Sequence, residues 1–190
     1  IQQAKSSGVW LVDLGAWDKV VDSLSPEQVV EAVFLTHSHY DHIYGINAFQ
    51  ENYPECPIYA SERTLAGLKD PKLNLSFYHE DPIIYNGDRG VELNAGYMSL
   101  NQLKIRFLPT PGHTPGHLVF EIENYLFTGD AYIPGVKVIT KLRGGNKAES
   151  KASLIAIRAL INEQTVLCPG HGSVQKGLEC IPHLDSLIHD

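Results

Sequence analysis

The sequence predicts a mixed α/β protein, and three patterns along its 190 residues indicate this class. Two apolar runs of strand length, residues 9–12 and 32–36, are separated by a segment with helical signals. From about Met98 the hydrophobic period changes to two, which is typical of half-buried strands. Residues 146–161 instead place apolar side chains at helical spacing, at Ala152, Ile155, Ala156 and Ala159. The length suits one domain, and we expect a single domain over residues 1–190.

Strands and helices alternate in the first half of the sequence. Three short apolar runs are expected to be buried strands, at residues 9–12, 32–36 and 57–60. Four segments carry helix-start signals and are expected to be helices: residues 16–24, a helix opening at Pro26 with Ser25 as its N-cap, 41–52, and 61–68. Residues 70–89 are rich in turn residues, and an ordered loop of this kind is often a binding loop.

The second half begins with strands of period two. Leu103, Ile105 and Phe107 alternate with charged residues and predict a half-buried strand. The elements expected after it are a hairpin of residues 118–121 and 125–128, a helix over 146–161, a buried strand over 165–168 and a final helix over 178–188.

Composition and charge argue against several classes of protein. The net charge of −7 disfavours general nucleic-acid binding, which needs clustered Lys and Arg. No stretch approaches the ~18 continuous apolar residues of a membrane span. The three cysteines contain no CxxC pair, which favours buried thiols in a reducing compartment, and we expect a cytoplasmic protein. The sequence begins at Ile1 rather than Met, so the question whether a leader peptide has been lost is left open.

The most informative stretch is His37-Ser38-His39-Tyr40-Asp41-His42, which directly follows an apolar run. His37 and His39 are two residues apart, so their side chains can point the same way on an extended backbone. A turn at Asp41-His42 can send these two side chains to a second, nearby point. Neutral imidazole and carboxylate are ligands of zinc and related divalent metals. The stretch therefore predicts half of a metal site.

Three later strand ends carry further candidate ligands. His113, Asp130 and His171 each lie beside a glycine after an apolar strand. With the first stretch they make seven side chains, which are too many for one tetrahedral zinc and suit two metals that share a carboxylate. Asp130 is the natural shared ligand, because its two oxygens can each hold one metal. We expect Zn²⁺ at both positions, with iron or manganese as alternatives.

The motifs His37-x-His39-x-Asp41-His42, Gly112-His113, Gly129-Asp130 and Gly170-His171-Gly172 resemble those of the metallo-β-lactamase superfamily in order and spacing. The resemblance implies a four-layer αββα sandwich of two mixed sheets. It implies a first metal on His37, His39 and His113, a second on Asp41, His42 and His171, and Asp130 between them. Asp13, in the family's strand-Asp-x-Gly signature, is expected to be structural. The family usually has one or two strands before this signature, and whether such strands are missing from this sequence is left open.

Two other histidines compete for a role in the site. The family pattern Gly-His-Thr-Pro-Gly places the ligand at His113, so His117 is expected to support the site rather than bind metal. His79 lies in the loop of residues 70–89 and is expected at the surface. We expect the same of His183 and His189.

The residues after Asp130 bear on the substrate. A basic run, with lysines at positions 137, 141, 147 and 151 and Arg143, forms a positive region in an acidic chain. It is compatible with an anionic small-molecule substrate or with a solvated loop. Lys141, Arg143 and Tyr132 are the candidate substrate-binding residues, and Tyr132 is equally compatible with apolar packing.

These features predict a dinuclear-metal hydrolase. Two divalent ions that share a water lower its pKa, and the resulting hydroxide attacks an electrophilic centre. Asp41 is expected to orient this nucleophile as well as bind metal. Similarity to glyoxalase II-type proteins favours an ester or thioester substrate. The alternatives are a phosphodiesterase, an iron-dependent sulfur dioxygenase, or a non-catalytic metal-binding or interaction protein, and the oligomeric state is left open.

Overall fold

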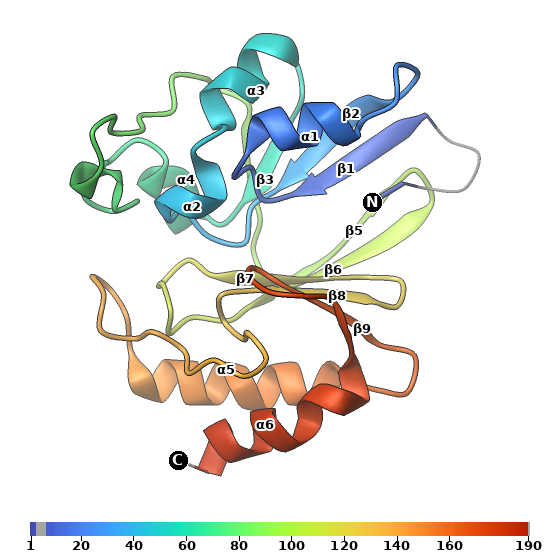
Figure 1. Cartoon of the computed structure of the whole chain (residues 1–190), viewed down its shortest axis with the longest axis vertical. Helices are drawn as coiled ribbons and strands as arrows, with labels where there is room; N and C mark the ends of the chain where they lie inside the picture. Colours follow the sequence, from blue (N-terminus) through green and yellow to red (C-terminus); the bar gives the residue numbers. More distant parts are fainter. Residues whose placement is uncertain (3–6, 190) are drawn as a thin grey trace. The chain divides into compact units, whose positions relative to one another are not determined.

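The computed structural model describes residues 1–2 and 7–189, and the chain divides into two compact units, Ile1–Leu93 and Asn94–Asp190. Each unit contains one β-sheet and its own helices (Figure 1). The mixed α/β class with two sheets is therefore confirmed. Among the described residues, every helix is too short or too polar to span a lipid bilayer.

The first unit has a four-stranded parallel sheet in the order β1-β2-β3-β4. Its strands are β1 (Gly8–Val12), β2 (Val29–Phe34), β3 (Ile58–Ala60) and β4 (Gly90–Glu92). Its helices are α1 (Trp17–Ser23), α2 (Tyr40–Ile43), α3 (Ile46–Asn52), α4 (Glu62–Gly67) and the 3₁₀ turn η1 (Ser76–Tyr78). Val12 pairs with Phe34, so β1 and β2 end at the same edge of the sheet. Asp13 and the histidine stretch follow these two ends.

A fully buried apolar face holds the histidine stretch on this unit. Ile43 of α2 and Ile46 and Phe49 of α3 are completely inaccessible and belong to the core under the sheet. The expected single helix over residues 41–52 is divided between α2 and α3, because the Gly45 N–H donates to the carbonyl of Leu14 (2.9 Å). A Cβ at Gly45 would lie 2.6 Å from the carbonyl oxygen of Gly15, so only glycine allows this close approach.

Two further expectations for the first unit differ from the structure. The helix expected at Pro26 is wrong: residues 26–27 form a turn, closed by Gln28 N–H donating to Ser25 O (3.0 Å), and the chain enters β2 at Val29. Strand β4 was not indicated by the sequence, because its three residues are exposed and carry no apolar alternation. The loop before β4 is irregular as expected, apart from η1, and the Ser61 cap of α4 is confirmed by a bond from Thr64 N–H (3.1 Å).

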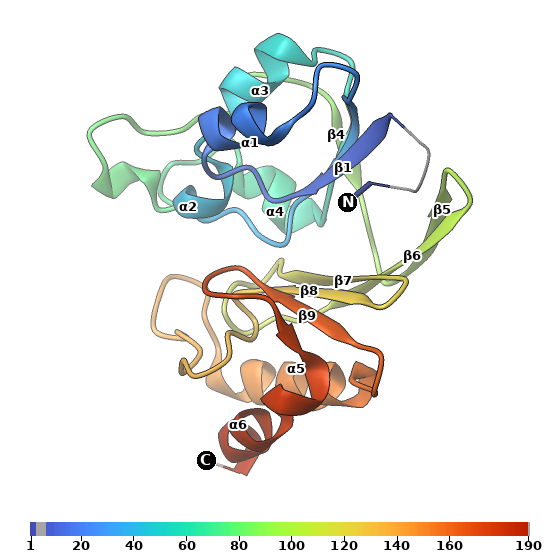
Figure 2. The same cartoon turned by 45° about the vertical axis from the view of Figure 1, so that its right-hand side comes forward.

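The second unit has a six-stranded sheet in the order β10-β9-β8-β7-β6-β5. Its strands are β5 (Gly96–Leu100), β6 (Leu103–Pro109), β7 (Leu118–Ile122), β8 (Tyr125–Gly129), β9 (Val166–Pro169) and β10 (Gln175–Lys176). Neighbours are antiparallel except β8 and β9, which run parallel and are joined through α5 (Lys147–Leu160). Figures 1 and 2 show α5 and α6 (Gly177–His189) side by side on one face of this sheet.

The second unit confirms the period-two strand and the helix expected over residues 146–161, but that helix does not bury the expected face, since Ile155 is 52% exposed. Ile105 is fully buried and Phe107 nearly so, while Lys104 between them is exposed. Helix α5 buries Leu154 and Ile157 and begins one residue after Asn146, whose side-chain oxygen accepts from two backbone N–H groups of the first turn. Strands β6, β8 and β9 end shortly before the three later candidate ligands.

Candidate metal centre

Three buried imidazoles gather in the loop that follows β2. His37 is completely inaccessible, and His39 and His42 are 5% and 3% exposed. The ring centroid of His37 lies 4.7 Å from that of His39 and 4.2 Å from that of His42. Burying three imidazoles together is unfavourable unless hydrogen bonds or a metal satisfy their nitrogens.

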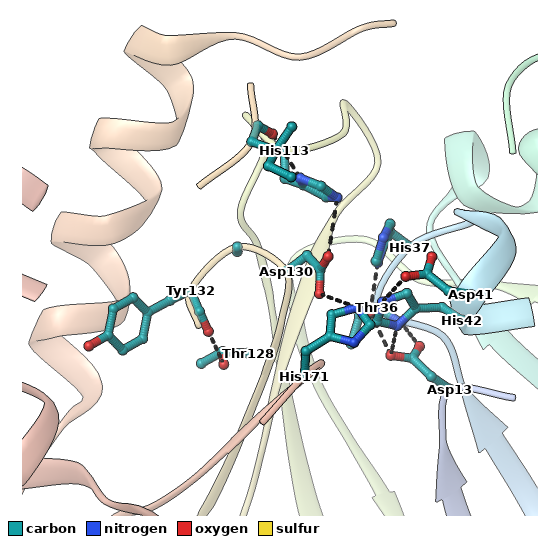
Figure 3. Close-up of polar contacts among 12 residues, drawn as sticks. Asp13, Thr36, His37, Asp41, His42, His113, Thr128, Asp130, Tyr132 and His171 are labelled. Carbon is teal, nitrogen blue, oxygen red and sulfur yellow. Dashed lines mark hydrogen bonds and ion pairs between the residues drawn. The ribbon is translucent and has the colours of Figure 1, made fainter. Parts of the chain in front are cut away.

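Hydrogen bonds that Asp13 accepts fix the tautomers of two of these rings (Figure 3). Oδ2 of Asp13 accepts the Thr36 hydroxyl proton (2.8 Å), so Oγ1 of Thr36 is left to accept a proton from Nδ1 of His37 (3.0 Å). Nδ1 of His42 donates to the same Asp13 oxygen (2.8 Å). Both imidazoles therefore carry their proton on Nδ1 and present the lone pair of Nε2, which is the arrangement found in metal-binding histidines.

Asp13 itself is held in an unusual backbone conformation. Its φ of 64° is in the left-handed region, which a non-glycine residue adopts at a cost. Its other oxygen, Oδ1, accepts the Thr36 backbone N–H (2.7 Å). Both carboxylate oxygens are thus used in hydrogen bonds within the unit, as a supporting role requires.

Asp41 is the one accessible member of the first ligand cluster, which comprises His37, His39, Asp41 and His42. Its side chain is 53% exposed, and Oδ2 lies 4.0 Å from Nε2 of His42. The nitrogens of His37 and His39 likewise lie within 4.8 Å of each other. The unit therefore brings together all four ligands predicted from the stretch of residues 37–42, with a carboxylate open to solvent.

In the second unit, Asp130 extends one oxygen toward each of two histidines (Figure 3). Oδ2 lies 3.6 Å from Nε2 of His113, and Oδ1 lies 3.6 Å from Nε2 of His171. The His113 side chain is 3% exposed, that of Asp130 is 13% and that of His171 is 49%. A carboxylate with its oxygens directed at two different imidazoles has the geometry of a shared ligand. His113, Asp130 and His171 form the second ligand cluster.

The tautomer of His113 is also fixed. Its Nδ1 donates to the backbone carbonyl of Ile139 (2.8 Å), so Nε2 carries the lone pair on the side of Asp130. A neutral imidazole nitrogen and an ionised carboxylate then face each other as two acceptors, which a cation bound between them stabilises.

His117 uses both ring nitrogens for a different purpose. Nε2 accepts the Ala131 backbone N–H (3.2 Å), so Nδ1 carries the proton and donates to Oγ1 of Thr110 (2.9 Å). Its ring therefore ties the end of β6 to the residue after Asp130. Both competing histidines carry the proton on Nδ1, but Nε2 of His117 accepts a backbone N–H, whereas Nε2 of His113 faces Asp130.

The candidate substrate residues lie in different environments. Tyr132 is completely buried, its hydroxyl donates to the carbonyl of Cys180 (2.9 Å), and burial raises its pKa above the usual value. It is a core residue and is not accessible to a substrate, because the α6 backbone covers its polar end. Lys141 and Arg143 are exposed in the loop before α5, and Lys141 lines a cavity there.

The remaining histidines of interest and the cysteines pack within their units. His79 is exposed as expected but stacks on Tyr40 with ring centroids 3.7 Å apart, a contact that the sequence did not indicate. His183 is half-buried, and its Nδ1 accepts the Gly135 N–H (3.2 Å). All three cysteines are free thiols; Cys56 and Cys180 are buried as expected, and Cys168 is half-buried. Burial raises the pKa of all three.

Comparison with known families decides the wider assignment. Residues 11–171 match the family model described as the metallo-beta-lactamase superfamily. The chain belongs to this superfamily. Most of its members are metal-dependent hydrolases that bind divalent metals. The donors in this chain fit such metals, because they are imidazoles and carboxylates and three of the rings present Nε2.

Several relatives match most of this chain. The hydroxyacylglutathione hydrolase of Salmonella typhi is 28% identical over 185 residues, which are 95% of this chain and 64% of that protein. The chain thus spans less than two thirds of the length of this relative. A B3 metallo-β-lactamase, BLEG-1, is 27% identical, with a TM-score of 0.87 over 98% of this chain and 91% of that one. TTHA1623, solved in a di-iron-bound form, is 26% identical, with a TM-score of 0.73 over 87% and 82%.

Proposed function

We propose that the chain is a dinuclear-metal hydrolase that cleaves an ester or thioester bond. The observation that carries the proposal is the orientation of the ligand imidazoles. His37, His42 and His113 each have Nδ1 bonded to a protein acceptor, which leaves Nε2 for a metal. His117 has the same tautomer but uses Nε2 to accept the Ala131 backbone N–H, so its ring serves the protein's own hydrogen bonds.

The ligand clusters of the two units divide between two metals in this proposal. The first metal takes His37, His39 and His113, the second takes Asp41, His42 and His171, and Asp130 is shared. The two directions taken by the Asp130 oxygens support its role as the shared ligand. Assembly of both metals requires the two units to act as one domain.

The chemistry is divided between the metals and the protein. When bound, divalent metals supply an acidified water and neutralise charge that develops on a substrate oxygen. To Asp41, whose carboxylate is half exposed, we assign the role of accepting a hydrogen bond from the nucleophile. Asp13 and Thr36 hold two ligand rings in the tautomer that binds metal.

The acyl class of substrate is supported by the relative with that activity. The Salmonella typhi protein is named a hydroxyacylglutathione hydrolase, and its similarity extends over nearly all of this chain. We therefore expect a small thioester as substrate. The substrate panel includes a thioester and an oxygen ester.

A matched substrate panel tests the proposal. The zinc-loaded protein is assayed with an acyl thioester, an acyl ester, a β-lactam and bis-p-nitrophenyl phosphate. We expect turnover of the acyl substrates, loss of turnover in His39→Ala, and wild-type rates in His189→Ala, which changes an exposed histidine in α6. Turnover of the phosphodiester alone, or full activity of His39→Ala, would contradict the proposal.

Iron-dependent oxidation is the second candidate, because TTHA1623 was solved with two irons. Imidazole and carboxylate ligands accept iron as well as zinc. Oxygen uptake by the iron-loaded protein in the presence of a persulfide, without hydrolysis of any panel substrate, would replace the hydrolase proposal.

A further inference from the structure

The second unit contains a cavity that none of its three candidate ligands lines. Its volume is about 540 Å³, within the range of small-molecule sites. The loop before α5, helix α5 and one residue of α6 form its walls. The lining residues are Lys137, Val138, Ile139, Thr140, Lys141, Lys147, Ser150, Lys151, Leu154 and Leu187, and we refer to them as the lysine cavity.

The lysine cavity combines aliphatic walls with a cationic rim. Val138, Ile139, Leu154 and Leu187 supply the aliphatic surface, and four lysines supply the charge. Ile139 is 54% exposed despite its apolar side chain. Among the described residues, Lys141, Lys147 and Lys151 form no ion pair with a carboxylate.

The positions of two of these lysines are unfavourable for the helix that carries them. Lys147 is the first residue of α5, where the helix dipole favours negative charge. Lys151 follows at i+4, so the two ammonium groups lie on one face and repel each other. A bound anion would remove both penalties, and no described acidic side chain lines the cavity.

Hydrogen bonds to backbone carbonyls hold the loop wall of the cavity in place. The carbonyl of Ile139 accepts from Nδ1 of His113 (2.8 Å), and the Asn146 N–H donates to Gly112 O (2.8 Å). Between them, the Gly145 N–H donates to Leu142 O (2.9 Å). The wall is therefore preformed, which lowers the entropic cost of binding a ligand.

We propose that the lysine cavity binds an amphipathic anion, with an aliphatic chain against Val138, Leu154 and Leu187 and an anionic head group at Lys147 and Lys151. A neutral apolar ligand would leave Lys147 and Lys151 without a counter-charge, and a small inorganic anion would leave the aliphatic wall exposed to water. The inference goes beyond the proposed hydrolysis, because His113, Asp130 and His171 do not line the cavity.

Calorimetric titration of the full chain tests both parts of the ligand. Decanoate carries the chain and the charge, butyrate lacks most of the chain, and decyltrimethylammonium has the opposite charge. We expect saturable binding of decanoate, at least about tenfold weaker binding of butyrate and no binding of decyltrimethylammonium. Equal affinity for decanoate and decyltrimethylammonium, or no binding of decanoate, would overturn the proposal.

A charge reversal locates the binding site. In Lys147→Glu/Lys151→Glu we expect the Kd for decanoate to rise at least about tenfold. The control, Lys19→Glu/Lys69→Glu, makes the same change of charge at exposed positions in the first unit and should leave the Kd unchanged. Glutamate near a helix N-terminus is favourable, so the Lys147/Lys151 variant should fold with an equal or higher Tm.

Metal content separates this proposal from the proposed function. The Lys147/Lys151 variant should bind as much metal as the wild type. It should also hydrolyse acyl substrates with short acyl chains at the wild-type rate. Protection of Lys147 and Lys151 from acetic anhydride by decanoate, read by mass spectrometry, gives an independent location. Unchanged decanoate affinity in the variant, or protection confined to other lysines, would contradict the assignment.

Discussion

Oδ2 of Asp13 lies 2.8 Å from Nδ1 of His42 and 2.8 Å from Oγ1 of Thr36. One carboxylate oxygen thereby orients two ligand rings, His42 directly and His37 through the Thr36 hydroxyl (3.0 Å). The arrangement explains why the residue after β1 adopts a positive φ: this conformation points the carboxylate back at the end of β2. The strand-Asp-x-Gly motif is therefore part of the metal site without contributing a ligand.

Asp13→Asn tests this relationship. The Asn amide has one acceptor oxygen, whereas Asp13 uses two: Oδ1 for the Thr36 backbone N–H and Oδ2 for the Thr36 hydroxyl and His42. The tautomers of His37 and His42 therefore lose their support. Loss of such a hydrogen-bond partner typically lowers metal affinity by about 10–100-fold. Zinc affinity measured against a competing chelator should fall by this amount. Asp22→Asn, at an exposed position of α1, is the control and should bind zinc as the wild type does.

His117→Ala should separate stability from metal binding. The substitution removes the bonds to Thr110 and Ala131 and leaves a buried backbone N–H without its acceptor. We expect a loss of about 1–3 kcal/mol in the free energy of unfolding, measured with urea, and an unchanged number of metals per chain. A loss of one metal per chain with little change in stability would instead make His117 a ligand.

Gly45→Ala tests the junction between α2 and α3. The added methyl would lie 2.6 Å from the carbonyl oxygen of Gly15 and 2.7 Å from Cβ of Trp17. Overpacking of this kind costs about 1–3 kcal/mol, and thermal denaturation should report it. Ala48→Ser, which adds one atom at an exposed position of α3, should change the Tm little. Equal Tm values for the two variants would refute the close approach.

Cys56 predicts a change in alkaline stability. Burial raises the pKa of its thiol from 9.0 to about 11, so the folded state binds this proton more tightly than the unfolded state. The stabilisation is complete below the unfolded pKa and is lost as the pH rises toward the folded one. Stability of the wild type should therefore fall between pH 9 and 11 by more than that of Cys56→Ala. Parallel pH profiles would contradict the raised pKa.

The sequence predicted the elements whose pattern depends on their own residues. The apolar alternation at Ile105 and Phe107 gave β6. The helical spacing of Ile155 with three alanines gave α5, although Ile155 is exposed and α5 instead buries Leu154 and Ile157. Strand β4 was missed because its residues are exposed and its pairing with β3 comes from the neighbouring strand. The division between α2 and α3 also depends on a distant residue, since Gly45 bonds to Leu14.

The candidate ligands could be proposed from the sequence because residue type and spacing carry metal chemistry, and within each unit the structure brings its own candidates close together. The hydrogen bonds that support these side chains were only partly predictable. The sequence marked Asp13 as structural, but the bonds through Thr36 arise where two strands end together. Tyr132 was open to two roles, and packing against α6 decided for the core. The lysine cavity depends on how the loop before α5 lies on that helix, which the basic run alone does not specify.

Metal content tests the central claim most directly. The purified chain is loaded with zinc, dialysed and analysed by inductively coupled plasma mass spectrometry, together with His37→Ala and the control His189→Ala. The account predicts about two metals per chain in the wild type and the control, as a dinuclear site requires, and a clear loss in His37→Ala. A wild-type chain that retains no metal, or a His37→Ala chain that retains as much as the wild type, would contradict it.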